Sequence, residues 1–184
     1  ITITGTAAGS QIGYSVSNAG DVNGDGKDDM LIGAYGYNSN AGIIYLIYGS
    51  STLTNINLDS LGSSGITITG VPGYYAGYSV SNAGDVNGDG KADILIGAYG
   101  SSSVYLIYGS ASLANINLAS LGSSGITITE TTSAQAGYSV SNAGDVNGDG
   151  KTDMLIAAPY FSSTGIVYLV YGSASLTNIN LASL

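Results

Sequence analysis

A nine-residue motif occurs three times in this chain of 184 residues and constrains its fold more than any other feature. The copies read Asp-Val-Asn-Gly-Asp-Gly-Lys-x-Asp and span residues 21–29, 85–93 and 145–153. Positions 1, 5 and 9 of the copies hold nine of the twelve carboxylates, and position 7 holds all three basic residues. The chain thus gathers its acid into three oxygen-rich loops, a pattern that indicates a hard cation.

The motif supplies the ligand types that Ca²⁺ prefers, roughly six to eight oxygens from carboxylates, amides and main-chain carbonyls. Alternating side chains at positions 1, 3 and 5 turn inward in a curling loop, and the glycines at positions 4 and 6 permit the sharp turn. The lysine is expected to bind the ion through its main-chain carbonyl, with its side chain in solvent. The last aspartate is expected to bind the ion through both carboxylate oxygens. We predict three Ca²⁺ ions per chain, at Asp21, Asn23, Asp25, Lys27 and Asp29; at Asp85, Asn87, Asp89, Lys91 and Asp93; and at Asp145, Asn147, Asp149, Lys151 and Asp153.

Two other interpretations of the motif are less economical. Asn-Gly and Asp-Gly are strong turn formers, so each loop could be a run of metal-free Asx turns. An EF-hand or dockerin-like loop needs an acidic ligand at position 12, where this chain has Ile32, Ile96 and Ile156. The three copies favour a calcium loop that joins two strands.

The loops belong to a longer repeat that fills the chain. Ile-Thr-Ile-Thr recurs at residues 1, 66 and 126, and the loops begin at residues 21, 85 and 145. A fixed period overrides the domain count that length alone suggests. We therefore predict one segment, 1–184, of three repeats: 1–65, 66–125 and 126–184.

Composition excludes several classes of function. Cys, His, Trp and Arg are absent, which rules out disulfides and zinc sites and excludes most nucleophile–base dyads. The net charge is −9 and no basic patch occurs, so nucleic acid is not an expected partner. No apolar run approaches the roughly 18 residues of a membrane span. No signal peptide is visible and the first residue is not Met, so we expect a mature or excised segment.

Each repeat is expected to form four strands, which in the first copy are Ile1–Thr4, Gly13–Ser17, Met30–Ala34 and Ile43–Tyr48. The first alternates apolar and polar residues, as a half-exposed rim strand does, and the second has the small residues of a crowded inner strand. The last two are continuously apolar and rich in β-branched and aromatic residues. The expected fold is all-β, with three four-stranded antiparallel β-propeller blades per chain. A β-solenoid is the alternative, although its usual coils are shorter than these repeats.

The motifs in this order resemble the FG-GAP repeats of integrin α-subunit propellers and their bacterial relatives. The resemblance covers all three repeats and rests on Gly-Tyr-Ser-Val before the loop, the loop itself, and Leu-Ile-Gly-Ala-Tyr after it. The Phe of the family's Phe-Gly is replaced by Ile12, Ala76 and Ala136, and Pro follows Gly-Ala only in the modified form Ala157–Pro159. These departures touch packing and leave the expected metal ligands intact.

The resemblance implies a non-catalytic, calcium-stabilised propeller for cell-surface adhesion, recognition or structural display, extracellular and bacterial, with a protein or glycan ligand. Ligand contacts are expected in the connections that differ between repeats, which carry the odd aromatics Tyr37, Tyr74, Tyr75 and Phe161. A lectin-like propeller that uses these aromatics is one alternative, and an accessory domain of a secreted hydrolase is another. Tyrosines that recur in every repeat, such as Tyr14, are instead expected to pack blades together.

Three blades are too few for a closed propeller, which typically has about four to eight. The chain begins with a rim strand, Ile1–Thr4, and ends with a connector, Gly172–Leu184, that in the other repeats leads to a rim strand. We therefore expect a homodimer in which each copy completes the last blade of the other, giving a six-bladed ring with two-fold symmetry. A longer parent chain that supplies further blades is the rival explanation.

Overall fold

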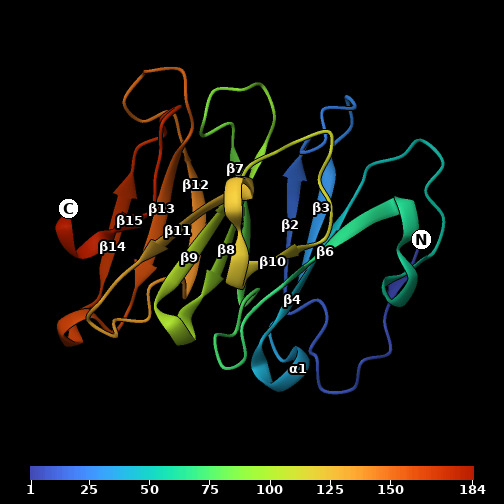
Figure 1. Ribbon diagram of the computed structural model, residues 1–184, viewed down its shortest axis with the longest axis horizontal. Coiled ribbons are helices and arrows are strands. Elements are labelled where there is room, and N and C mark those ends of the chain that lie inside the picture. Colours follow the sequence, from blue (N-terminus) through green and yellow to red (C-terminus); the bar gives the residue numbers. More distant parts are fainter.

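The computed structural model describes residues 1–184 and consists of three sheets standing side by side, with the N-terminus at one end of the row and the C-terminus at the other (Figure 1). In each sheet three strands of one repeat pair antiparallel in chain order, and in the first two sheets strands from further along the chain are added at the outer edge. The inner strands of neighbouring sheets, β2 (Ser15–Gly20), β7 (Ser79–Gly84) and β12 (Ser139–Gly144), lie next to one another. This arrangement is that of consecutive propeller blades.

The strands of the three sheets follow the same order from the inside outward. The first sheet contains β2 (Ser15–Gly20), β3 (Asp29–Ala34), β4 (Ile43–Ile47), β6 (Gly65–Thr69) and β10 (Ile116–Asn117). The second contains β7 (Ser79–Gly84), β8 (Asp93–Ala98), β9 (Ser103–Ile107), β11 (Gly125–Thr129) and β15 (Ile179–Asn180), and the third contains β12 (Ser139–Gly144), β13 (Asp153–Ala158) and β14 (Ile166–Val170). A separate parallel pair joins β1 (Ile3–Thr4) to β5 (Ile56–Asn57).

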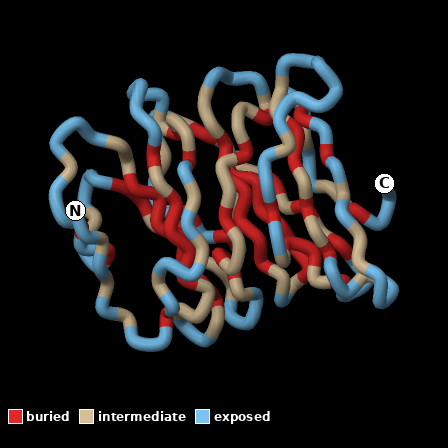
Figure 2. Tube along the Cα trace, turned by 180° about the vertical axis from the view of Figure 1, so that it is seen from behind, coloured by how far each residue is buried: buried red, intermediate tan, exposed pale blue.

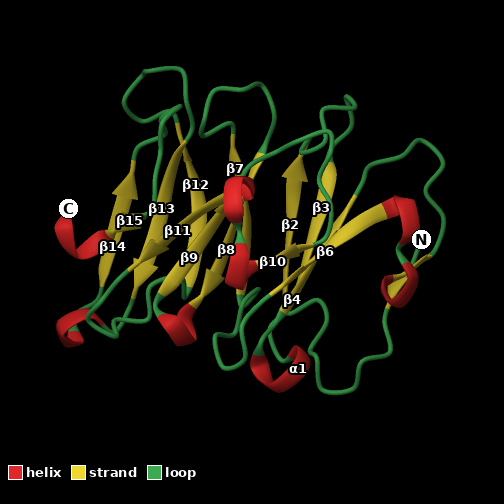
Figure 3. Ribbon diagram, in the orientation of Figure 1, coloured by secondary structure: helices red, strands yellow, loops and turns green.

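Helical structure is confined to short turns between strands (Figure 3). A four-residue helix, α1 (Tyr37–Asn40), connects β3 to β4, and 3-10 turns η3 (Tyr99–Ser101) and η6 (Phe161–Ser163) occupy the equivalent positions in the other repeats. The connectors to the rim contain η1 (Leu58–Ser60), η2 (Gly62–Ser64), η4 (Leu118–Ser120), η5 (Gly122–Ser124) and η7 (Leu181–Ser183). No helix is long and apolar enough to cross a membrane.

The all-β, antiparallel prediction is confirmed, but the expected count of four strands in every blade is wrong. Two sheets have five strands and the third has three. The reason is that the rim strand of a blade comes from the following repeat: β6 pairs antiparallel with β4 of the preceding repeat, with Thr69 opposite Ile43. A short connector strand then pairs parallel with that rim strand, as β10 does with β6. Within this chain the outer edge of β14 has no partner strand.

The blades approach closely where the second strand of one faces the start of the next. A side chain on Gly33 would collide with the carbonyl oxygen of Gly77, and one on Gly97 with that of Gly137. Beside this contact Ser15 Oγ donates to the Gly77 carbonyl at 2.7 Å. Glycine is therefore required at residues 33 and 97 by backbone packing between blades.

The core consists of the continuously apolar strands of the first two blades, buried from both sides, whereas β14 of the last blade is partly exposed (Figure 2). Leu31, Ile44, Ile94 and Leu106 are among the side chains that are fully buried. In the rim strand β6, Ile66 and Ile68 are buried while Thr67 is half-buried, which matches the predicted alternation. Burial of these strands stabilises the sheets by roughly 25 cal/mol per Å² of apolar surface and fixes the loops at their ends.

Candidate metal-binding loops

The three acidic loops lie at one end of the molecule, the upper edge in Figure 1. Each joins an inner strand to the second strand of its blade, and the pairing of Gly20 with Asp29 closes the first one. Glycines at positions 4 and 6 have positive φ in every copy, with 76° at Gly24 and 85° at Gly26 in the first. The predicted sharp turn and its position between two strands are both present.

The first aspartate of each loop organises the turn. Asp21 Oδ1 accepts hydrogen bonds from the amides of Gly24 at 2.8 Å and Asp25 at 2.9 Å, and Oδ2 accepts one from Gly26 at 2.8 Å. Asp85 and Asp145 receive the same three bonds in their own loops. In the third loop such bonds, led by that from Gly150, lower the pKa of Asp145.

The ninth aspartate is buried at the foot of each loop. Asp93 Oδ1 accepts from the amide of Gly109 at 2.9 Å and Oδ2 from that of Val86 at 2.9 Å. Burial raises the pKa of Asp93 to about 6, the backbone bonds oppose the shift, and the carboxylates of Asp89 and Asp85 add to it. Burial likewise raises the pKa of Asp29. These carboxyl groups tie the loop to the strands and carry negative charge that burial leaves poorly solvated.

The middle positions lie on the outside of the loop. Asn23 Oδ1 accepts from the Asp25 amide at 2.8 Å, and Asp25 Oδ1 accepts from the Lys27 amide at 3.0 Å. The Lys27 side chain was expected to lie in solvent; it is 45% exposed, and its Nζ lies 3.5 Å from Asp25 Oδ1 at the surface. Lys91 makes the same contact with Asp89 at 3.9 Å. Both pairs are well exposed, so they add little stability.

The predicted ligands are therefore brought into one loop in each repeat, with their oxygens turned toward main-chain amides. No group of three or more acidic side chains converges as a ready-made cage. A carboxylate oxygen that accepts one N–H still has acceptor capacity, and every donor in the loop is a hard oxygen of the kind that Ca²⁺ takes. The residues fit Ca²⁺ through the side chains of positions 1, 3, 5 and 9 and the carbonyl of position 7. The ion would supply the positive charge that three neighbouring carboxylates lack.

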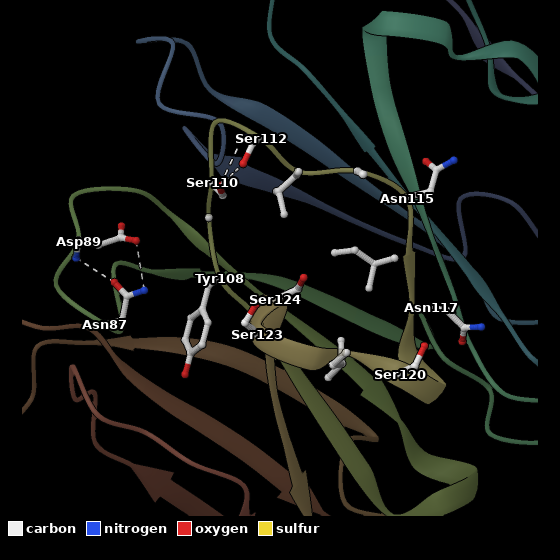
Figure 4. A pocket seen from close by; sticks show the side chains of 15 residues that line it. Asn87, Asp89, Tyr108, Ser110, Ser112, Asn115, Asn117, Ser120, Ser123 and Ser124 are labelled. Carbon is white, nitrogen blue, oxygen red and sulfur yellow. Dashed lines mark hydrogen bonds between the residues drawn. The ribbon is translucent and has the colours of Figure 1, made fainter.

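A polar hollow that sequence reasoning missed lies beside the second loop (Figure 4). It measures about 650 Å³, and its wall includes Asp89, Tyr108, Ser110 and Asn115. An equivalent hollow of about 520 Å³ lies beside the first loop. The hollows form because each connector to the rim passes over a loop, and no single motif in the sequence signals that packing.

An array of tyrosines lies at the opposite end of the blades, where the inner strands begin. The rings of Tyr14 and Tyr78 have centroids 4.9 Å apart, and those of Tyr78 and Tyr138 are 5.0 Å apart. The Tyr78 hydroxyl donates to that of Tyr138 at 3.1 Å, and this bond is the main reason why the pKa of Tyr78 is raised. Tyr35 and Tyr99 pack edge-on against the same rings. The expectation that recurring tyrosines join neighbouring blades is confirmed for this set.

Three blade-like sheets with an acidic loop between the first two strands define a repeat protein of the propeller class. The FG-GAP repeat matches residues 12–47, 76–109 and 136–170, together more than half of the chain. The chain belongs to the FG-GAP repeat family, as its motifs predicted.

Comparison with known proteins gives relatives that share most of this chain. It is 31% identical over 182 residues to integrin alpha pat-2 of Caenorhabditis elegans, covering 88% of the chain and 14% of that protein. It is 29% identical to integrin alpha-V of Gallus gallus, with 92% and 16% covered. It is also 32% identical to phosphatidylinositol-glycan-specific phospholipase D of Bos taurus, with 91% and 21% covered. The chain therefore spans a small part of the length of each relative.

Proposed function

We propose that this chain is a non-catalytic, calcium-stabilised propeller segment that serves cell-surface adhesion, recognition or structural display, outside a bacterial cell. The observation that carries the proposal is the division of the molecule into two ends. One end repeats the same acidic loop three times, whereas the connections at the other end differ in every repeat. A repeated structural device at one end and variable surface at the other suit a scaffold that presents binding loops.

Calcium binding is supported by the composition and electrostatics of the loops. Each places carboxylates at positions 1, 5 and 9 and an amide at position 3, and the burial that raises the pKa of Asp93 is opposed by backbone hydrogen bonds from Gly109 and Val86. A bound cation relieves that cost. Extracellular calcium, in the millimolar range, fills even weak sites of this kind.

A lectin-like role is the second candidate, and a specific observation favours it. Tyr14, Tyr74 and Tyr160 are 49%, 38% and 60% exposed at the end opposite the acidic loops. Exposed aromatic rings can stack on the apolar faces of sugars. The third candidate is an accessory domain of a hydrolase, which the similarity to a phospholipase D supports. The lack of His and Cys argues against catalysis by this segment itself.

The proposed partner in assembly is a second copy of the chain. Val167 in the edge strand β14 is 62% exposed and Tyr171, the residue after it, is 53% exposed. The corresponding edges of β4 and β9 are covered by Gly-Ile-Thr-Ile-Thr segments. A segment of that sequence therefore fits β14. The first strand of a second copy carries Ile-Thr-Ile-Thr, and a continuation of the same chain is the competing source.

The function is tested by binding with and without calcium. The chain, in about 2 mM CaCl₂, is applied to arrays of glycans and of matrix proteins, and hydrolysis of a glycosylphosphatidylinositol is measured in parallel. We expect calcium-dependent retention on one array that is lost in Tyr74→Ser or Tyr160→Ser, and no hydrolysis. Retention that survives both substitutions and chelation, or measurable turnover, would contradict the proposal.

A further inference from the structure

Glu130, the only glutamate of the chain, is buried in an unusual way. It follows β11 directly and is 3% exposed. Its Oε2 accepts hydrogen bonds from the amide of Thr132 at 2.9 Å and its hydroxyl at 2.7 Å, with a longer bond from the Ala134 amide at 3.4 Å. Its Oε1 has no partner at all. A buried carboxylate oxygen without a partner is costly, so the residue calls for a compensating group.

The equivalent position in the first blade has no room for such a side chain. The equivalent residue there is Gly70. The Glu130 amide donates to the Ser102 carbonyl, and the Gly70 amide donates to the Gly42 carbonyl at the same place in the first blade. A Cβ on Gly70 would collide with the Ala41 carbonyl and lie 2.7 Å from Ala76 Cβ. In the second blade the connection between β8 and β9 is shorter than that between β3 and β4, and Ser102, the last residue of that connection, accepts the hydrogen bond from the Glu130 amide at 2.9 Å. The buried acid is therefore a local departure of one blade from the repeat.

A cavity of about 330 Å³ lies against this carboxylate, large enough for a side-chain-sized ligand. Its wall consists of oxygen-bearing and small residues and contains no lysine or other cation; it includes Glu130, Tyr99, Ser102, Thr131, Ser133 and Gln135. Three of these are non-glycine residues in the left-handed region, with φ of 50° at Ser102 and 57° at both Ser133 and Gln135. Such backbone strain gathers at ligand clamps and other functional sites.

We propose that this cavity binds a primary alkylammonium group, with Glu130 Oε1 as its counter-charge. An ammonium has three donors and no acceptor. The residues that line the cavity include Glu130, whose Oε1 is buried without a partner, and Thr131 and Ser133, which carry hydroxyl groups. The ring of Tyr99 contributes an aromatic wall that favours a cation. The ligand relieves the unpaired charge that the fold leaves buried.

Two other cations fit this site less well. A guanidinium binds a carboxylate through two parallel bonds, but Oε2 is already occupied by Thr132 and Ala134. Ca²⁺ prefers several charged oxygens, and this cavity has a single carboxylate. The ammonium, a compact point charge, matches the one free oxygen.

This site would give the proposed recognition role a ligand chemistry, and it rests on that role. The test uses the full chain in calcium, with backbone amide chemical shifts recorded during titration with n-butylammonium chloride and with N-acetyl-lysine amide. Butanol and N-acetyl-arginine amide serve as the neutral and guanidinium comparisons. We expect saturable shifts at Glu130, Thr132 and Ala134 with both ammonium ligands, and at least about tenfold weaker binding of the comparisons. Tighter binding of the lysine derivative identifies a protein side chain as the source, and equal binding identifies a free amine.

Two variants separate the site from general effects. Glu130→Gln keeps the shape and removes the charge, and Thr131→Tyr fills the cavity from an exposed position without altering Glu130. Each should weaken ammonium binding by about tenfold or more. Asp59→Asn, the same charge change on another connector, should leave it unchanged. Unaltered ammonium binding in either test variant, or no saturable shift in the parent chain, overturns the proposal. The proposed scaffold role is tested separately, by the dependence of the melting temperature of the same sample on calcium.

Discussion

The two ends of the blades, one with the acidic loops and the other with the tyrosine array, differ in how strongly the repeats resemble one another. At the loop end, Asp21, Asp85 and Asp145 each accept the same three backbone hydrogen bonds, so all three loops have the same hydrogen-bonded conformation. At the tyrosine end, the equivalent connections form a four-residue helix once and 3-10 turns twice. The loop end is fixed by charge and hydrogen bonding within nine residues, whereas the other end need only bridge two strands.

The difference shows where the molecule tolerates change. A substitution at the loop end must keep an oxygen in a set place, since the buried Asp93 serves both the loop and the next strand end. At the other end the connection between β8 and β9 is shorter than that between β3 and β4 and Glu130 is buried, without altering the strands on either side. New binding chemistry can therefore arise at the variable end while the loops hold the blades in register.

Calcium removal should have the largest effect, because it acts on all three loops together. Binding to the folded state alone stabilises by about 2.7 kcal/mol per site at a hundredfold excess over Kd. For three sites in a chain of this size, chelation should lower Tm by on the order of 20 °C. The measurement is a thermal melt in calcium and in EDTA, with EDTA plus excess calcium as the control. An unmoved Tm would show that the loops are metal-free Asx turns.

Asp93→Ala and Asp89→Ala should separate the structural from the metal-binding role within one loop. Loss of Asp93 leaves two buried amides, those of Gly109 and Val86, without acceptors, which costs about 2–5 kcal/mol with or without calcium. Asp89 lies on the exposed side of the loop, so its loss should cost less than about 0.5 kcal/mol in EDTA and considerably more in calcium. Denaturant melts of both variants in each condition check this. Equal costs for Asp89→Ala in the two conditions would remove it from the ligand set.

Gly33→Ala should destabilise the contact between the first two blades by about 1–3 kcal/mol, because the new methyl group meets the Gly77 carbonyl. Gly97→Ala should do the same between the second and third. Gly9→Ala is the control: its φ of 75° is unfavourable for alanine, unlike that of Gly33, but no atom lies near the added methyl. Free energies of unfolding from urea melts compare the three, and a smaller cost at residue 33 than at residue 9 would argue against tight backbone packing there.

The sequence predicted what is local and repeated, and missed what depends on how repeats meet. Asp21–Asp29 encodes its own turn, and the apolar run of β4 specifies a buried strand, so both were predictable. The rim position of Thr67 and the addition of its strand to the blade before it were also correct, but the fifth, parallel strand that β10 contributes to that blade was not predicted. The burial of Glu130 was not predictable, because it depends on how the segment after β11 folds back so that Thr132 and Ala134 donate to the carboxylate.

Assembly into a six-bladed ring should be weak unless one residue changes. The residue equivalent to Gly33 and Gly97 in the third blade is Ala157, and its methyl group would meet the Gly13 carbonyl of a second copy that docked as the blades do within the chain. Ala157→Gly removes that obstacle at a cost of about 0.5–1 kcal/mol within the strand. We therefore expect the dimer to have a lower Kd in Ala157→Gly than in the parent chain, measured by sedimentation equilibrium in calcium, even though the variant monomer is slightly less stable. If both chains remain monomers of 18.3 kDa at high concentration, the edge of β14 is not filled by a second copy, and the Gly-Ile-Thr-Ile-Thr segment that fits it must come from a continuation of the chain.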